Sequence, residues 1–148
     1  MRPVASVLCL AGKGPLDEAA SAMIAQLLGK HGLGARAVPH EASSREAIAL
    51  LDVSEVTMVC ISYLDISGAP SHLRYLIRRL RRKLPHAPIL VGFWSADDEV
   101  LKEGRVRAII GADYYATSLR EAVSFCIEAE HKLGEASRIA KPFEVASA

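Results

Sequence analysis

The sequence has no apolar run approaching the roughly 18 to 20 consecutive residues that span a bilayer. Its N-terminus also lacks the layout of a signal peptide. Neither charge is in excess, with 18 Lys and Arg against 17 Asp and Glu, which argues against a surface built throughout for nucleic acid. We therefore expect a soluble, cytoplasmic chain.

Cysteine is scarce, and no metal or catalytic cluster is evident. Cys9, Cys60 and Cys126 lie inside apolar segments without disulfide or metal spacing, so we expect small core residues in a reducing compartment. The histidines fall at helix ends and turns, without a cysteine or carboxylate at a ligand spacing, and are predicted to be surface residues. They are His31, His40, His72, His86 and His131.

What the chain does contain is 148 residues, 51% of them hydrophobic, enough for one domain with a sizeable core. Strand-like runs alternate with helical runs. Strands are predicted at 5–11, 34–40, 56–64, 88–94 and 107–110, the last with a possible extension through 116, and helices at 16–32, 43–52, 70–84, 97–104 and 118–133. We place one domain at 1–134, with Gly134 as the helix stop, and a flexible tail at 135–148.

Two helices carry finer predictions. Ser43, with Glu46 three residues on, has the spacing of a capping box for the helix at 43–52. The helix at 16–32 is predicted to end at Gly32 and to bury one apolar face, formed by Leu16, Ala20, Met23, Ile24, Leu27 and Leu28.

Five successive β-α units predict a parallel sheet, because right-handed helical crossovers join such strands. The predicted fold is a three-layer α/β sandwich, flavodoxin-like or Rossmann-like, with five parallel strands in the order 2-1-3-4-5. Ligands of such sheets bind beyond the carboxyl ends of the strands, at the switch point between strands 1 and 3. The loops at 12–17, 64–70, 92–97 and 113–118 are therefore the candidate site.

The loop after the first strand, Gly12-Lys13-Gly14, precedes a helix start, where free amides and the helix dipole favour an anion. It is too short for a Walker loop, and it is not a dinucleotide loop because position 17 is Asp. Asp17 and Glu18 would stabilise the helix dipole and repel phosphate. A simple capped turn and one wall of a ligand site both remain open.

Aromatic and hydroxyl side chains follow the other strands. Phe93, Trp94 and Ser95 could line a small pocket with residues of neighbouring strand ends, or the two rings could pack beneath adjacent loops. The candidate ligand-binding residues are Gly12, Lys13, Gly14, Asp17, Ser62, Tyr63, Phe93, Trp94, Ser95, Thr117 and Ser118.

The helix predicted at 70–84 contains the basic run RRLRRK at 78–83. Leucines and Ile77 form one stripe, and Arg74, Arg78, Arg81 and Arg82 occupy the remaining surface. A solvated face and a surface for an anionic partner both fit, whether that partner is lipid, acidic protein or nucleic acid. Nucleic acid fits least, because Tyr75 is the one aromatic residue of this helix.

The strand order also suits a phosphoacceptor receiver domain. That chemistry needs an acidic pair after strand 1, an aspartate ending strand 3 and a lysine ending strand 5. Asp65 could be the acceptor, but strand 1 ends in Ala11-Gly12-Lys13 and strand 5 in Thr117-Ser118. Most of the phosphotransfer site is therefore missing.

Four stretches resemble a cobalamin-binding domain over roughly residues 5–130: Pro15–Leu28, Ser62-Tyr63-Leu64, Val91-Gly92-Phe93 and Gly111-Ala112-Asp113. In that family D-x-H-x-x-G follows strand 1, S-x-L ends strand 3 and a Gly-Gly pair ends strand 4. Ser62 and Leu64 match this pattern.

The same alignment departs from the family at its ligand residues. The cobalt-ligating His falls on Asp17, the preceding Asp on Pro15 and the Gly on Ala20. A carboxylate in place of imidazole changes the cobalt chemistry. Phe93 replaces the second glycine of the pair, and its ring should fill space left for the nucleotide tail. The resemblance therefore implies the fold without bound cobalamin, and we expect no cofactor.

The stretches 14–39, 58–64 and 73–94 are similar to the cytoplasmic C-terminal domain of bacterial permeases of the autoinducer-2 exporter-like family. This resemblance implies a domain at the inner face of the cell membrane, with a permease, another protein or a second copy as partner.

Two function classes follow from the sequence. One is a non-catalytic sensory or regulatory domain that binds a small molecule or protein at the switch point. The other is a corrinoid- or nucleotide-binding carrier or enzyme domain, or a receiver-like domain. The missing motifs favour the first.

Overall fold

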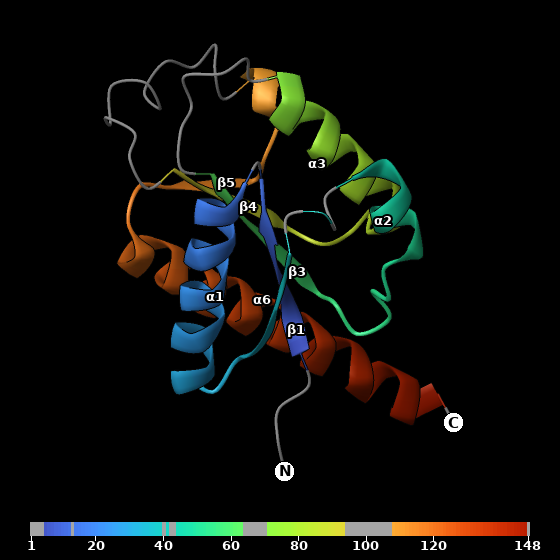
Figure 1. Ribbon diagram of the computed structural model, residues 1–148. Coiled ribbons are helices and arrows are strands. Elements are labelled where there is room, and N and C mark those ends of the chain that lie inside the picture. The colour runs from blue at the N-terminus through green and yellow to red at the C-terminus, as the bar shows by residue number, and fades with distance from the viewer. Residues whose placement is uncertain are drawn as a thin grey trace.

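The structure, a computed structural model, describes residues 5–12, 14–39, 41, 44–63, 71–93 and 108–147. Its centre is a parallel sheet in the order β2-β1-β3-β4-β5 (Figure 1). The strands are β1 (Ala5–Ala11), β2 (Gly34–Val38), β3 (Met58–Tyr63), β4 (Ile89–Phe93) and β5 (Tyr114–Ala116). The predicted strand order, parallel pairing and flavodoxin-like α/β class are confirmed.

Helices cover both faces of the sheet (Figure 1). The helices α1 (Pro15–Lys30) and α6 (Leu119–Ser147) pack on one face, and α2 (Arg45–Leu50) and α3 (Ser71–Lys83) on the other. All six residues of β3 are buried, as expected for a central strand covered on both sides. The buried side chains of the strands therefore divide between two hydrophobic cores, one on each face of the sheet.

The two cores have different compositions because successive side chains of a strand point to opposite faces. The α1/α6 face holds the three cysteines and several alanines, together with Met58 and Leu90. The α2/α3 face holds leucines and isoleucines, together with the rings of Tyr63 and Phe93. The sequence predicted the buried strands but not this division.

Helix α1 ends where the sequence predicts. Gly32 has a φ of +82°, which favours glycine, and its N–H donates to the Gly29 carbonyl at 3.1 Å. The Leu33 N–H donates to the Leu28 carbonyl at 2.9 Å, which completes a Schellman motif.

The predicted apolar face of α1 is wrong at two positions. Leu16 is 68% exposed and Met23 is 52% exposed, while Asp17 and Ser21 are buried. The buried face of α1 therefore includes small and polar residues that the prediction placed outside it, and two large apolar side chains of the predicted face are exposed instead.

Three predicted boundaries are also wrong. The N-cap of α2 is Ser44, whose hydroxyl accepts from the Ala47 N–H at 3.2 Å, and not Ser43. Residues 108–110 are helical, and β5 begins after the turn at Gly111, whose φ is +76°. Helix α6 continues through Gly134 to Ser147. The flexibility of the tail stays a prediction, and the helix predicted at 97–104 lies outside the described residues.

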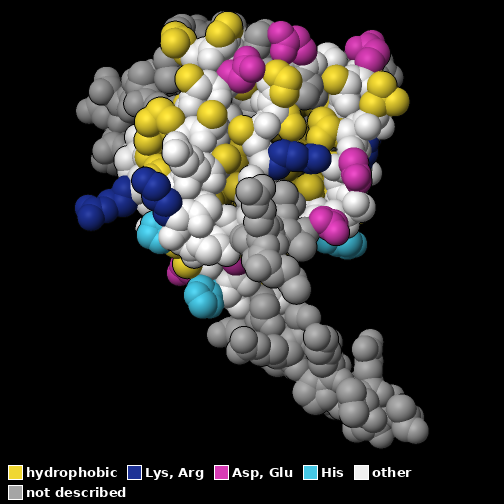
Figure 2. All heavy atoms as spheres, turned by 60° about the horizontal axis from the view of Figure 1, so that its bottom comes forward, with side chains coloured by type: hydrophobic (Ala, Val, Ile, Leu, Met, Phe, Trp, Pro, Cys, Tyr) yellow, Lys and Arg dark blue, Asp and Glu magenta, His cyan; other side chains and the backbone are white. Residues whose placement is uncertain are grey.

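Across the described ranges, none of the helices is both long enough and apolar enough to cross a membrane. Figure 2 brings the bottom of the view in Figure 1 forward and shows hydrophobic side chains at the surface between separate charged groups. Just before the amino ends of β3 and β4, a hollow of about 280 Å³ has a mostly apolar lining, which includes Val56, Leu84, Pro85 and Leu133.

Candidate functional site

Gly12 occupies the switch point, and its surroundings explain why it is glycine. Its N–H donates to the Ser62 carbonyl at 2.9 Å, and its carbonyl accepts from His72 Nε2 at 3.0 Å. A Cβ atom added at Gly12 would overlap the ring of Tyr63. The close approach at this glycine is therefore made by Tyr63, a residue of the chain itself.

Three aromatic rings fill the α3 side of the strand ends. The ring centroids of Tyr63 and Phe93 are 6.1 Å apart in an edge-to-face arrangement, and those of Phe93 and Tyr115 are 6.5 Å apart and nearly parallel. Tyr63 is 4% exposed and Phe93 is fully buried. Buried aromatic pairs of this kind stabilise a core beyond their area alone. The predicted candidates Tyr63 and Phe93 thus meet each other.

The α1 side of the same strand ends is built from small residues. In the sheet register Ala11 lies beside Ser62, Ser62 beside Gly92 and Gly92 beside Ala116. Ser62 follows the same alternation as Met58 and Cys60, so its hydroxyl faces α1 and α6 while Tyr63 faces α3. These two predicted pocket residues are therefore on opposite faces of the sheet.

Two buried hydroxyl groups on the α1 side have no hydrogen-bond partner in the described part of the chain. They are Ser62 Oγ and Ser21 Oγ, and both residues are fully buried. A buried polar group without a partner costs about 1 to 3 kcal/mol. Ser21 is not among the residues predicted from the sequence, although a hydroxyl at the centre of an otherwise apolar helix face is a signal of a buried polar group.

Two of the remaining polar candidates, Asp17 and Ser118, cap helices. The Gly14 N–H donates to Asp17 Oδ2 at 3.3 Å, and Asp17 is 4% exposed. Ser118 Oγ accepts from the Glu121 N–H at 3.1 Å at the start of α6, and Thr117 Oγ1 lies 3.5 Å from a Glu121 carboxylate oxygen. Capping satisfies amides that a helix start leaves without partners. The candidates Lys13, Trp94 and Ser95 lie outside the described residues.

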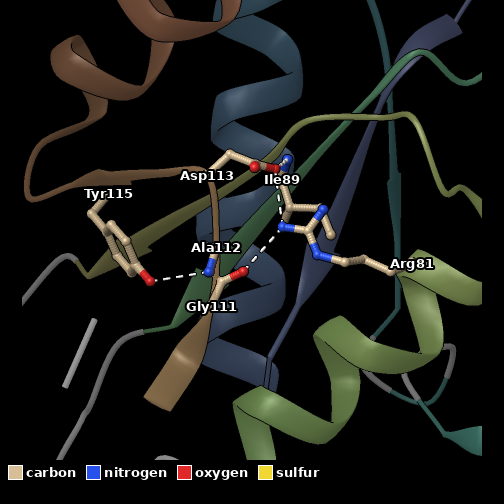
Figure 3. Close-up of polar contacts among 6 residues, drawn as sticks. All are labelled: Arg81, Ile89, Gly111, Ala112, Asp113 and Tyr115. Atoms are coloured by element: carbon tan, nitrogen blue, oxygen red, sulfur yellow. Dashed lines mark hydrogen bonds and ion pairs between the residues drawn. The ribbon is translucent and has the colours of Figure 1, made fainter. Parts of the chain in front are cut away.

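Arg81 differs from the other arginines of α3 because it holds a turn (Figure 3). Its guanidinium donates to the Gly111 carbonyl at 3.0 Å and to Asp113 Oδ2 at 3.1 Å. The same carboxylate oxygen accepts from the Ile89 N–H at 2.8 Å. The Tyr115 hydroxyl accepts from the Ala112 N–H at 3.0 Å. Arg81 therefore ties α3 to the segment that leads into β5.

Two hollows lie along α3. One, of about 250 Å³, is lined by Tyr75, Arg78, Arg79 and Arg82. The other, of about 270 Å³, is lined by Ile48, Ala49, Arg79, Arg82 and Lys83. Arg79 is not among the candidates predicted from the sequence, although it lies directly beside Arg78 in the basic run.

The cysteines form one buried group, so their prediction as core residues is confirmed. Cys9 and Cys60 are register partners on adjacent strands, and Cys126 joins them from α6. Burial raises the pKa of Cys9 to about 12, and a hydrogen bond with Cys126 together with burial raises the pKa of Cys60. Both thiols are therefore protonated at neutral pH.

In the described portion, no group of three or more His, Cys, Asp or Glu residues could hold a metal.

No protein-family model and no curated protein matches this sequence. A cobalamin-binding protein from Desulfitobacterium hafniense DCB-2 is similar in structure, with a TM-score of 0.60 and 15% identity over 84% of this chain and 58% of that one. A protein described as a pilus assembly protein (cpaE), from Burkholderia thailandensis E264, has a TM-score of 0.60 and 14% identity over 86% of this chain and 99% of that one.

At these identities the likeness establishes the fold alone. The matched part amounts to 58% of the cobalamin-binding protein. The described residues thus form a five-stranded α/β domain of flavodoxin-like type, similar in fold to a cobalamin-binding protein and to a protein described as serving pilus assembly.

Proposed function

We propose that the chain is a non-catalytic regulatory domain that acts by contacting a partner protein, with a membrane permease as that partner. The filled α3 side of the strand ends carries the proposal. There the ring of Tyr63 packs against Phe93 and occupies the space beside Gly12, at the end of the sheet where α/β proteins of this topology usually hold a ligand. A domain of this kind would regulate its partner through contacts made by its surface. The choice of a permease as that partner rests on the sequence resemblance.

The outer face of α1 is a suitable contact surface. Leu16 and Met23 lie seven residues apart, so they fall on the same side of the helix, and both are more than half exposed. Exposed large apolar side chains grouped on one element are typical of protein contacts. Between Glu18 and Lys30 the helix carries no charged residue.

Site-specific photo-cross-linking in cells tests this proposal. A photoreactive residue at Met23 is expected to give a discrete adduct with one membrane protein, and the same residue at exposed Lys132 on α6 serves as the control. A permease identified in the Met23 adduct would support the proposal. Equal adduct patterns at both positions, or none at Met23, would contradict it.

One observation favours a second candidate function, the binding of a small molecule on the α1 side. The hydroxyls of Ser21 and Ser62 are buried on the α1 side without partners in the described residues, and Ser62 belongs to a row of small residues, so a polar ligand on this side could supply a missing partner. The structural neighbour named as cobalamin-binding makes a corrinoid the first compound to test. Saturable binding that disappears in Ser62→Val would favour this function.

We propose further that cobalamin is not coordinated by this chain. Asp17, at the position of the family's ligating histidine, is nearly buried and accepts a hydrogen bond from the Gly14 N–H. Its carboxylate is thus engaged with the start of its own helix. Phe93, expected from the sequence to fill the space of a nucleotide tail, lies on the α3 side with Tyr63. Equilibrium dialysis against hydroxocobalamin is expected to show no micromolar binding, and a changed corrin spectrum would contradict this.

A further inference from the structure

The outer surface of α3 carries arginines that have no structural role in the described residues. Arg81 and Lys83 do have such roles: Arg81 holds Gly111 and Asp113, and Lys83 Nζ donates to the carbonyls of Ile48 and Ala49 at 2.6 and 2.8 Å. By contrast, no hydrogen bond or ion pair within the described part holds the guanidinium groups of Arg74, Arg78, Arg79 and Arg82.

These four arginines are concentrated along one line. Arg74, Arg78 and Arg82 are four residues apart, so they lie above one another on the helix and span about 12 Å. All three are exposed, and Arg79 lies beside them in the wall of both hollows. The sequence of α3 contains no acidic residue, so its own side chains leave this positive charge uncompensated.

Apolar side chains border the same surface. Leu50, the last residue of α2, is 86% exposed, and Tyr75 is 55% exposed. Tyr75 lines the hollow with Arg78 and Arg79, and the residues just before Leu50 line the adjoining hollow. Exposed apolar side chains beside a cationic row suit an occupant that is both anionic and apolar.

We propose that this basic face, defined by Arg74, Arg78, Arg79, Arg82, Tyr75 and Leu50, docks onto an anionic phospholipid surface. Guanidinium groups bind phosphate oxygens, tyrosine is favoured at the level of the headgroups, and leucine enters the acyl boundary. Nucleic acid would use the arginines but leave Leu50 in water. A free phosphate would reach a few members of a row about 12 Å long. The regulatory function proposed above does not require this lipid contact.

Co-sedimentation with vesicles tests the proposal. The full chain is expected to bind vesicles of phosphatidylglycerol mixed with phosphatidylcholine and not vesicles of phosphatidylcholine alone. Attraction to an anionic surface changes about fivefold for each basic residue, so Arg74→Gln, Arg78→Gln and Arg82→Gln together are expected to weaken binding about 100-fold. Rising salt is expected to release the parent protein, because it screens exposed charges.

A charge-matched control separates the basic face from overall charge. Lys30, Arg120 and Lys132 are exposed basic residues of α1 and α6, on the other face of the sheet. Their combined substitution by glutamine removes the same charge and is expected to leave vesicle binding within about fivefold of the parent. Circular dichroism checks that each variant is folded.

The apolar part of the proposal has its own pair of variants. Leu50→Ser is expected to weaken binding severalfold without changing its salt dependence, whereas Leu16→Ser, on the exposed side of α1, should leave it unchanged. Three results would overturn the lipid assignment: absent binding to anionic vesicles, equal binding by the two triple variants, or equal binding by the two serine variants. If duplex DNA, and not vesicles, loses affinity in the arginine variant, the face binds nucleic acid instead.

Discussion

The two sides of the sheet differ at the carboxyl ends of the strands, although the same strands supply both. On the α3 side Tyr63 and Phe93 fill the space with rings, and Gly12 leaves room for one of them. On the α1 side the sheet presents only small residues at the strand ends, namely Ala11, Ser62, Gly92 and Ala116. The residues on both sides are buried, so burial alone does not distinguish them. Side-chain volume does: on the α3 side the strands' own rings fill the space at the strand ends, whereas on the α1 side the covering helices must fill it.

The largest effect is expected from emptying the ring cluster. Phe93→Ala removes a fully buried ring and is expected to lower the free energy of unfolding by about 3 to 5 kcal/mol, because the cavity adds to the lost burial. Tyr75→Ala, at an exposed ring, should change it by less than about 0.5 kcal/mol. Urea denaturation measures both, and similar losses in the two variants would refute the closed α3 side.

The fold could be predicted from the sequence because strand and helix periods depend on local residue order. The boundary errors arose where that order is ambiguous. The run RAII at 107–110 resembles a strand, but Gly111 adopts a positive φ and the chain enters the sheet three residues later. Leu16 and Met23 suit an apolar helix face, yet the sheet beneath accepts Ala20 and Ser21.

The candidate site was less predictable, because its contacts join distant segments. Alternation along β3 could have shown that Ser62 and Tyr63 diverge. The pairing of Arg81 with Asp113 spans 32 residues, and no local pattern marks it. Nor could sequence alone show that Tyr63 would be the neighbour of Gly12.

A second prediction compares the two glycines of the first loop. Gly12→Ala is expected to cost about 1 to 3 kcal/mol of stability, because the new methyl group meets the ring of Tyr63. Gly14→Ala meets no atom within 4 Å and is expected to cost at most about 1 kcal/mol, as a changed N-cap. Chemical denaturation ranks the pair, and an equal or reversed order would show that Gly12 is not a packing position.

A third prediction compares two arginines of α3. Arg81→Gln is expected to lower the free energy of unfolding by about 1 kcal/mol, since it removes hydrogen bonds to the turn before β5. Arg78→Gln, at an exposed position, should change it by less than about 0.5 kcal/mol. Thermal and urea unfolding both report this difference. A loss at Arg78 equal to that at Arg81 would mean that the basic face also stabilises the fold.

The cysteine group of the α1 side gives a pH-dependent prediction. The pKa of Cys9 rises from 9.0 to about 12 on burial, so the unfolded chain releases this proton at a lower pH than the folded chain. The stability due to the protonated thiol is present below pH 9 and is lost as pH rises toward 12. Unfolding of Cys9→Ala should therefore depend less steeply on pH in this range than that of the parent, and equal slopes would contradict the buried thiol.

The smallest expected effect concerns Ser62. Ser62→Ala removes a buried hydroxyl without a partner and is expected to leave stability unchanged or to raise it by up to about 1 kcal/mol. Ser44→Ala, which removes the side-chain cap of α2, should instead lower stability by about 1 kcal/mol. A large loss of stability in Ser62→Ala would show that its hydroxyl is satisfied in solution.

The most direct test of the account is an amide chemical-shift titration with hydroxocobalamin, flavin mononucleotide and ATP, observed at Ser62, Gly92 and Ala116. These amides lie at the carboxyl ends of the neighbouring strands β3, β4 and β5, with Ser62 on the strand that borders the switch point, so a ligand held at the strand ends is expected to perturb them. If the domain acts through surface contacts, none of the three compounds will cause a saturable shift. A saturable shift at micromolar concentration that is lost in Ser62→Val would show a ligand site at the strand ends and contradict the central claim.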